Sequence, residues 1–226
     1  MGERGPVVTI DGPAGAGKGT VARALAEQLG YRLLDTGAMY RALAWSVVQA
    51  GIGTDNGPAL GRHLERVQVE LRGEHAYVDG RDVTDEIRTP EISALTSRLS
   101  ALPAVREKLT PLQRALAVAG GVVLEGRDTG TVVCPEADVK FYLVASVEER
   151  ARRRYAELRG RGGAADLASV RAEILTRDEQ DTGRALAPLR RAADAVEIDT
   201  TALTIDQVVD RMLDVIDERK RCCTRS

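Results

Sequence analysis

The apolar positions of this sequence follow two alternating spacings along most of the chain. Compact apolar runs such as GVVLEG (121–126) and VKFYLVA (139–145) are typical of buried parallel strands. Other segments repeat apolar residues at helical spacing, as in TVARALAEQLG, which ends at Gly30. The predicted strands are 7–10, 31–35, 121–126, 139–145 and 195–199, and the predicted helices are 20–30, 37–51, 147–159, 166–181 and 204–219. This alternation predicts an α/β fold, a parallel sheet flanked by helices on both faces.

One segment has a different period. Between about residues 63 and 90, apolar and polar residues alternate on either side of Gly73, from Val67 to Val78. A period of two around a glycine turn predicts an antiparallel hairpin. Since two strands alone are marginally stable, we expect this small sheet to pack beside the main one. The prediction is a single domain over 1–226 that carries an antiparallel-sheet insertion at about 63–100.

Composition narrows the class of protein. Of the 226 residues, 43% are apolar and 29% are charged, which is ordinary for a soluble globular chain. No apolar run approaches 18 residues, and the N-terminal MGERGP lacks the apolar core of a signal peptide. A net charge of −2 provides no overall positive field for nucleic acid, and three cysteines are too few for a disulfide framework. We expect a cytoplasmic monomer that binds neither membranes nor nucleic acid.

The segment TIDGPAGAGKGT (9–20) matches a phosphate-binding loop. It follows a predicted strand and opens a predicted helix, which is the context that this motif requires. Its glycines allow backbone N–H groups to converge on phosphate oxygens, and Lys18 adds a movable charge. The ATP-binding candidates are Gly12, Pro13, Ala14, Gly15, Ala16, Gly17, Lys18, Gly19 and Thr20.

Gly19 stands where the common form of this loop has a metal-binding Ser or Thr, and the hydroxyl is shifted to Thr20. The variant GxxGxGKGT resembles the loop of the nucleoside monophosphate kinases. In that group the metal ion is held largely by nucleotide phosphates and water, which suits Mg²⁺. The resemblance implies a P-loop kinase fold, ATP as the phosphate donor and Mg²⁺ as the cofactor, and it leaves the direct metal ligands unknown.

A second candidate anion site, DTGAMYR (35–41), follows the second predicted strand and opens the next helix. Thr36 is expected to cap this helix and to donate to an anion, and Arg41 offers a planar fork for a phosphate. Taken alone, the pattern is equally compatible with an ordinary helix cap and a solvated arginine.

LEGRDTGTVVCP (124–135) places Arg127 and Asp128 directly after a predicted strand, at the edge where open α/β sheets bind ligands. The two side chains could also form a structural ion pair. Together with DTGAMYR, EIRTPE (86–91) and TRDEQDTGRALAPL (176–189), the segment matches one family in order and spacing along nearly the whole chain. The sequence resembles the bacterial cytidylate kinases.

This resemblance implies a transferase that moves the γ-phosphate of ATP to CMP or dCMP. It assigns Asp128 to the 4-amino group of cytosine, and Arg106 and Ser97 to the acceptors of the ring edge. Uracil would present a carbonyl to the carboxylate, a buried mismatch that costs about 1–3 kcal/mol. CMP is therefore expected to be preferred to UMP by about 5- to 150-fold.

Arg177, Asp181 and Arg184 fall on one face of a predicted helix, a pattern that most often marks a solvated surface. The resemblance assigns the first two to the sugar hydroxyls and Arg184 to the phosphate. Because sugar contacts need not require a 2′-hydroxyl, dCMP is expected to be accepted as well. The CMP-binding candidates are Thr36, Arg41, Ser97, Arg106, Arg127, Asp128, Arg177, Asp181 and Arg184.

Only four of the 32 basic residues are lysines, and six of the 28 arginines lie within residues 150–161. This run fits a solvated helix in which Glu149 pairs with Arg153, or a nucleic-acid site, although it has a single aromatic residue. In the resembling family this region closes over ATP, which implies a helical lid at about 150–165, with GRGGAA (160–165) as its mobile loop. Phosphoryl transfer requires positioning and charge neutralisation. The catalytic candidates are Lys18, Arg127, Arg153, Arg154 and Arg184.

Two other functions remain open at this point. A kinase of the same fold with a different small acceptor would be indicated if UMP, AMP or a non-nucleotide outran CMP. A nucleotide-gated module that binds nucleic acid through its arginines would show retention on RNA with steep salt dependence, and no ADP release. The lid and acceptor patterns favour the kinase.

Overall fold

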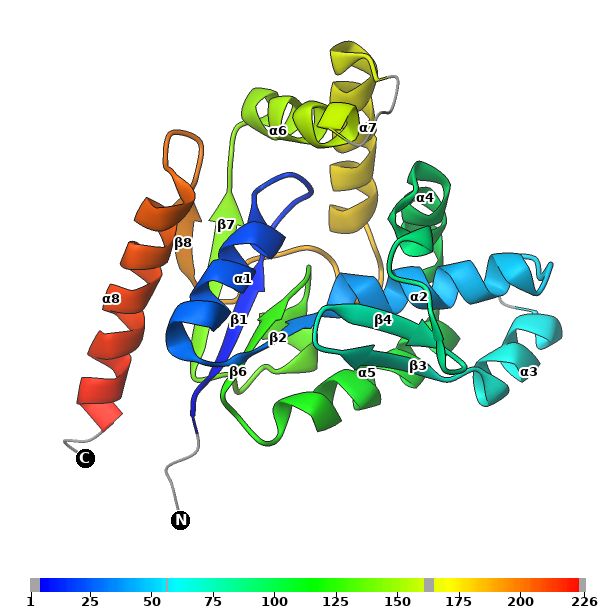
Figure 1. Cartoon of the computed structure of the whole chain (residues 1–226), viewed down its shortest axis with the longest axis horizontal. Coiled ribbons are helices and arrows are strands. Elements are labelled where there is room, and N and C mark those ends of the chain that lie inside the picture. Colours follow the sequence, from blue (N-terminus) through cyan, green and yellow to red (C-terminus); the bar gives the residue numbers. More distant parts are fainter. Residues whose placement is uncertain (1–4, 56, 161–164, 224–226) are drawn as a thin grey trace.

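A five-stranded parallel sheet forms the centre of the molecule (Figure 1). The computed structural model describes residues 5–55, 57–160 and 165–223. The strands are β1 (Val7–Asp11), β2 (Arg32–Asp35), β6 (Val122–Glu125), β7 (Val139–Val144) and β8 (Val196–Asp199), in the spatial order β2-β6-β1-β7-β8. All four pairings are parallel, which confirms the predicted α/β sheet.

Helices cover both faces of the sheet. On one face, α1 (Lys18–Leu29) and α8 (Ile205–Cys223) pack over Val123 of β6 and its neighbours. On the other face, α2 (Thr36–Gln49) and α5 (Pro103–Ala117) pack over Val122 and Leu124. Successive residues of one strand thus enter opposite cores, which explains why the strands read as continuous apolar runs.

The predicted hairpin is present and lies within a larger insertion. Strands β3 (Val69–Arg72) and β4 (His75–Val78) form the hairpin, and a short β5 (Arg81–Asp82), which was not predicted, completes a three-stranded antiparallel sheet. The alternation was expected to begin near residue 63, but residues 63–66 belong to helix α3 (Pro58–Arg66). The small sheet packs on α2 rather than beside the main sheet, and its Ala76 and Val78 join the core on that side.

Three helices escaped prediction: α3, α5, and α4 (Pro90–Leu99), which follows a 3₁₀ turn at Glu86–Arg88. Both α4 and α5 carry a proline in the first turn, where the missing N–H costs nothing. They bring two of the acceptor candidates to the site. The 3₁₀ turn lies in the EIRTPE motif, so this part of the resemblance marks the entry to α4.

Helices α6 (Val147–Gly160) and α7 (Leu167–Thr182) lie together at the top of Figure 1, above the loop that joins β1 to α1. They share a small apolar cluster of their own, formed by Ala151, Val170 and Ile174. Of the loop predicted at 160–165, residues 161–164 lie outside the described part of the chain. Within the described residues, no helix combines the length and the apolar character needed to cross a bilayer.

Candidate active site

The loop between β1 and α1 has the geometry of a phosphate cradle. Gly12 has φ 147°, and a β-carbon there would lie 2.1 Å from the Leu143 carbonyl oxygen, so only glycine fits. Gly17, at φ 89°, is the N-cap of α1, which begins at Lys18 and not at residue 20 as predicted. The Lys18 ammonium donates to the Pro13 carbonyl at 2.8 Å and is buried. Burial, together with the nearby Arg127 guanidinium, lowers the pKa of Lys18 to about 7.

Two carboxylates stand at the ends of neighbouring strands below this loop. Asp35 of β2 and Glu125 of β6 are partners in the parallel register. Burial and the adjacent Asp35 raise the pKa of Glu125 to about 7. Burial alone would raise the pKa of Asp35 as well, but the Arg41 guanidinium, whose Nη2 donates to it at 2.8 Å, leaves that pKa lowered.

Helix α2 is capped by Asp35 and not by Thr36 as predicted. Asp35 has extended backbone angles, so its carboxylate reaches the Ala38 N–H at 2.8 Å. Thr36 is the first residue of the helix, and its hydroxyl donates to the Glu125 carbonyl oxygen at 2.8 Å. The hydroxyl therefore ties α2 to β6.

A buried ion pair joins two of the base-reading candidates. Arg106 of α5 and Asp128, which follows β6, bond to each other with side chains that are each 9% exposed. The Arg106 guanidinium also donates to the Ser100 carbonyl at 3.2 Å and lies over the Tyr40 ring, 5.8 Å from its centroid. Burial raises the pKa of Asp128, and Arg106 opposes that rise. Ser97 donates to Gln180 at 3.1 Å, which links α4 to α7.

A second cluster is centred on Asp181, whose side chain is 1% exposed. It accepts from the Arg127 Nε at 2.9 Å and forms an ion pair with Arg184. Arg184 lies beyond the end of α7, because the helix ends at Thr182 with Gly183 as its C-cap, so the predicted helical face holds only in part. Burial and the Arg127 charge lower the pKa of Arg177 to about 10, and its Nε is buried without a partner among the described residues.

Arg127 and Asp128 do not form the structural ion pair with each other that their adjacency in the sequence allowed. Each binds a distant residue, Arg127 to Asp181 and Asp128 to Arg106. The peptide between them thus separates the two clusters, one near the sugar and phosphate candidates and one near the base candidates.

The arginines of α6 differ in their surroundings. Arg153 donates to Glu149, as predicted, at 2.8 Å, and to the Thr200 carbonyl at 2.6 Å, and its Nη1 lies beside Gly17 of the loop. Arg154 forms an ion pair with Glu157 at 2.7 Å, and the two side chains are 28% and 42% exposed. Of the two predicted catalytic arginines of α6, Arg153 is therefore the one that lies against the phosphate loop.

Arg150, which sequence reasoning missed, is the most buried of these arginines, at 5% exposure. Its guanidinium donates to the Ala14 carbonyl of the loop at 3.1 Å and pairs with Asp178 of α7 at 2.6 Å. One side chain thus connects the phosphate loop, α6 and α7.

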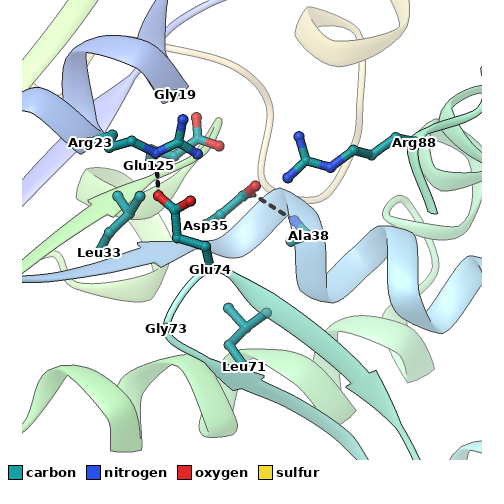
Figure 2. A pocket seen from close by; sticks show the side chains of 10 residues that line it. All are labelled: Gly19, Arg23, Leu33, Asp35, Ala38, Leu71, Gly73, Glu74, Arg88 and Glu125. Atoms are coloured by element: carbon teal, nitrogen blue, oxygen red, sulfur yellow. Dashed lines mark hydrogen bonds and ion pairs between the residues drawn. The ribbon is translucent and has the colours of Figure 1, made fainter. Parts of the chain in front are cut away.

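Figure 2 shows a cavity beside the start of α1, between the end of β2 and the hairpin of the insertion. Arg23 of α1 and Glu74 of the hairpin turn, which both line the cavity, form an ion pair (Figure 2). On the far side Arg88 extends toward the start of α2, and Asp35 and Glu125 line the interior (Figure 2). Gly19 is the one predicted ATP-binding residue on the wall, so the cavity connects the donor loop to the insertion.

Comparison with known proteins decides the family. A family model described as cytidylate kinase matches residues 8–218. The cytidylate kinase of Geobacter sulfurreducens is 54% identical over 224 residues, which is 97% of this chain and 96% of the relative. The chain belongs to the cytidylate kinase family. The cytidylate kinase of Symbiobacterium thermophilum is 49% identical over 217 residues, which is 94% of this chain and 96% of that one.

Among solved structures, a gluconokinase from Sinorhizobium meliloti 1021 superposes with a TM-score of 0.51 at 18% identity, covering 99% of this chain and 98% of that one. At this identity the likeness shows the fold alone. The predicted family, the P-loop kinase fold and the assignment as a kinase are confirmed.

Within this cytidylate kinase fold, the structure brings the acceptor candidates together from four separate segments: α2, α4–α5, the loop after β6, and α7 with the residues after it. The residues that sequence reasoning missed are mostly carboxylates: Asp11, Asp35, Glu125 and Asp178. Three of them end short strand runs, VVTID, RLLD and VVLE, so a carboxylate that terminates a predicted strand was the available signal.

Proposed function

We propose that this chain transfers the γ-phosphate of ATP to CMP or dCMP, giving ADP and CDP or dCDP, within the family shown above. The observation that carries the proposal is the placement of the phosphate loop against two preformed charge clusters, Arg106–Asp128 and Arg127–Asp181–Arg184. A buried carboxylate and several guanidiniums fit a cytosine ring with its phosphate.

In this proposal the Gly12–Thr20 loop and Lys18 hold the phosphates of ATP, as the resemblance suggests. Thr36, Arg41 and Arg127 face the acceptor phosphate, with Arg184 on the same side. An ionised phosphate oxygen of CMP attacks the γ-phosphorus, and the bond to the leaving ADP oxygen breaks. No general base is needed, because the attacking oxygen carries no proton near neutral pH.

Mg²⁺ fits this site as an ion carried by the nucleotide. Across residues 5–55, 57–160 and 165–223, no group of three or more His, Cys, Asp or Glu side chains could hold a metal ion. Phosphate oxygens and water would therefore supply the ligands, as Mg²⁺ tolerates well. When bound, the ion would neutralise charge on the transferring phosphoryl group.

The base assignment rests on donor and acceptor geometry. Asp128 is a buried acceptor, and its partner Arg106 is a buried donor held in place by Ser100. Cytosine offers an amino donor and ring acceptors in that order, whereas uracil reverses the first position. Arg177 and Asp181 are proposed to contact the sugar, and Ser97 the ring edge.

ADP release measured across the common ribo- and deoxyribonucleoside monophosphates tests this function. CMP and dCMP should be the fastest acceptors, with UMP slower by about 5- to 150-fold in kcat/KM. Equal rates with CMP and UMP would refute the base assignment. A negligible rate with dCMP would show that the sugar site requires the 2′-hydroxyl.

The lid, proposed at about 150–165, has its own test. Replacing Arg153 and Arg154 together by Ala should lower kcat far more than the affinity for CMP, because these side chains are proposed to stabilise the transferring phosphoryl group. Arg152→Ala is the matched control, since that side chain is 69% exposed and binds the same Glu149. An unchanged kcat in the double variant would mean that Arg153 and Arg154 do not act on the transferring phosphoryl group.

The remaining expectations belong to the same proposal. The insertion at about 63–100 would bind the acceptor within a single domain, and the protein would act as a cytoplasmic monomer without nucleic-acid partners. The near-neutral net charge supports the last point. Gel filtration with light scattering and a salt-dependent RNA retention assay would check the oligomeric state and the partner class.

A further inference from the structure

Asp11, the last residue of β1, is a buried carboxylate at the entrance to the phosphate loop. Asp11 is 4% exposed, and both oxygens of its carboxylate accept hydrogen bonds. Oδ1 accepts from the backbone N–H of Thr129 at 2.9 Å and from the Thr129 hydroxyl at 2.8 Å. Oδ2 accepts from the Gly130 N–H at 2.7 Å. All three donors belong to one segment, the start of the π-helical turn Thr129–Val133.

No cation of the described chain forms an ion pair with this carboxylate. Burial raises the pKa of Asp11, and the hydrogen bonds from Gly130 and Thr129 oppose that rise. A buried carboxylate without a counter-ion is costly, and an apolar residue would hold the end of a buried strand at less expense in free energy. The position therefore requires an acceptor for two converging N–H groups.

The segment that Asp11 holds is the one that carries the acceptor-facing side chains. Arg127 and Asp128 directly precede Thr129, and they point into the two charge clusters described above. Asp128 is also bound from the other side, since its carbonyl accepts from the N–H groups of Val132 and Val133. The Asp11 bonds thus fix the base of a short turn whose first two side chains meet the acceptor.

At two glycines the turn packs too closely against its neighbours to accept a β-carbon. A β-carbon at Gly130 would lie 2.8 Å from the Thr9 hydroxyl, on the strand that ends at Asp11. A β-carbon at Gly126 would lie 2.6 Å from the Thr36 hydroxyl, on α2. The turn therefore packs closely against both β1 and α2. The Gly126 N–H extends the pairing of β6 with β1 by donating to the Ile10 carbonyl at 3.0 Å.

We propose that Asp11 is a positioning residue for phosphoryl transfer: it fixes Arg127 and Asp128 to the strand that carries the phosphate loop, so that donor and acceptor keep one alignment. The inference rests on the proposed (d)CMP kinase function. Asp11 itself touches neither nucleotide in this scheme. Its effect passes through the turn, and misplacement of a reacting group by about 1 Å can cost on the order of 100-fold in rate.

Asp11→Asn tests the proposal with little change of shape. The carboxamide offers one acceptor and one donor, so at least one of the three N–H or O–H groups of the turn loses its partner and meets a second donor. We expect kcat with CMP to fall by about 10- to 100-fold. Because the loop itself is intact, KM for ATP should stay within threefold. The ratio of kcat/KM for CMP over UMP should also fall, since Asp128 moves with the turn.

Asp138→Asn is the matched control. Asp138 accepts from the Val7 N–H at 2.7 Å, at the opposite end of the same strand and away from the phosphate loop. Its replacement also removes a carboxylate that binds the backbone of β1, but it should leave kcat, KM and base preference at wild-type values. An equal loss of activity in both variants would mean that weakening β1 anywhere lowers activity, and would overturn the specific role of Asp11.

Thr129→Val covers the case in which Asp11→Asn does not fold. It removes one hydrogen bond and keeps both backbone donors, so kcat should fall by about three- to tenfold, in the same direction and with a weaker preference for CMP. Wild-type kinetics in every folded variant of this pair would overturn the proposal, even with a lowered melting temperature. If the wild-type protein itself fails to phosphorylate CMP, the proposed function fails first and this inference falls with it.

Discussion

Asp128→Asn separates the structural role of the Arg106–Asp128 pair from its proposed reading of the base. Both side chains are 9% exposed, so removal of the carboxylate charge leaves the guanidinium buried with a weaker acceptor. Deleting one partner of a buried pair outright costs about 3–5 kcal/mol. Asn keeps the shape and one carbonyl acceptor, so we expect a smaller loss of about 1–3 kcal/mol in the free energy of unfolding.

The effect on the substrate follows from the same chemistry. Asp128 can only accept, whereas the Asn carboxamide can rotate to donate its NH₂ to the uracil carbonyl. The penalty against UMP, about 1–3 kcal/mol in the wild type, should disappear, so the preference for CMP should fall by about 5- to 150-fold. The fall should come from slower CMP turnover together with unchanged or faster UMP turnover.

Coupled ADP release at saturating ATP, with CMP and UMP titrated separately, measures the preference, and urea unfolding measures the stability. Glu86→Gln provides the control, because its pair with Arg81 is exposed on both sides and should contribute about 0–1 kcal/mol. If Asp128→Asn loses stability as expected and still prefers CMP as strongly as the wild type does, the pair is purely structural and the base must be read elsewhere.

Four further outcomes are expected. The pKa of Lys18 is lowered from 10.5 to about 7, so between these pH values the unfolded chain binds more protons than the folded chain. The free energy of unfolding should therefore rise as the pH increases from 7 to 10.5 in the wild type, but not in Lys18→Met. Glu125 has its pKa raised from 4.5 to about 7, so stability should fall as pH rises through that window, and Glu125→Gln should abolish the fall in urea titrations. Arg150→Lys should lower the free energy of unfolding by about 1–3 kcal/mol, because the lysine ammonium lacks the fork of donors that binds Asp178 and the Ala14 carbonyl together. The same variant should raise KM for ATP. An unchanged KM would contradict the link between Arg150 and the phosphate loop. Gly126→Ala should lose about 1–3 kcal/mol from overpacking, as seen by thermal unfolding, whereas unaltered stability would mean that the turn can relax.

The main sheet and its helices could be predicted because their signals are local. The runs at 121–126 and 139–145 contain strands β6 and β7, and Gly30 ends α1 in a left-handed conformation, as its position after the last apolar repeat indicated. Helix α3 was missed because its last residues, 63–66, were assigned to the alternation around Gly73, and α4 and α5 were also not predicted. Their N-terminal prolines at 58, 90 and 103 were a usable signal, since proline favours the first turn of a helix.

The identity of the site residues could be predicted, but their pairings mostly could not. The Glu149–Arg153 contact was predictable, because four residues of helix bring the two side chains together. The Arg127–Asp181 bond joins positions 54 residues apart, and no local rule connects them. The N-cap of α2 was misjudged for a simpler reason, because Asp and Thr are both favourable N-cap residues. An N-cap residue has extended backbone angles, and here the extended backbone ends at Asp35, so Thr36 is already helical.

The pairings give the acids of the site a structural role beside the arginines. Four of the predicted acceptor-site arginines, at 41, 106, 127 and 184, are held by carboxylates. Burial, and then the neighbouring Arg127 guanidinium, lower the pKa of Arg177. Guanidiniums that are proposed to bind phosphate repel one another, so buried acids that balance their charge stabilise the cluster. Asp128 and Asp181, predicted as nucleotide contacts, therefore also balance the charge of these arginines. Asp181 forms ion pairs with both Arg127 and Arg184. A phosphate bound by these two arginines should weaken both ion pairs. The free energy of substrate binding then depends on how the Asp181 carboxylate and the phosphate share the two guanidiniums.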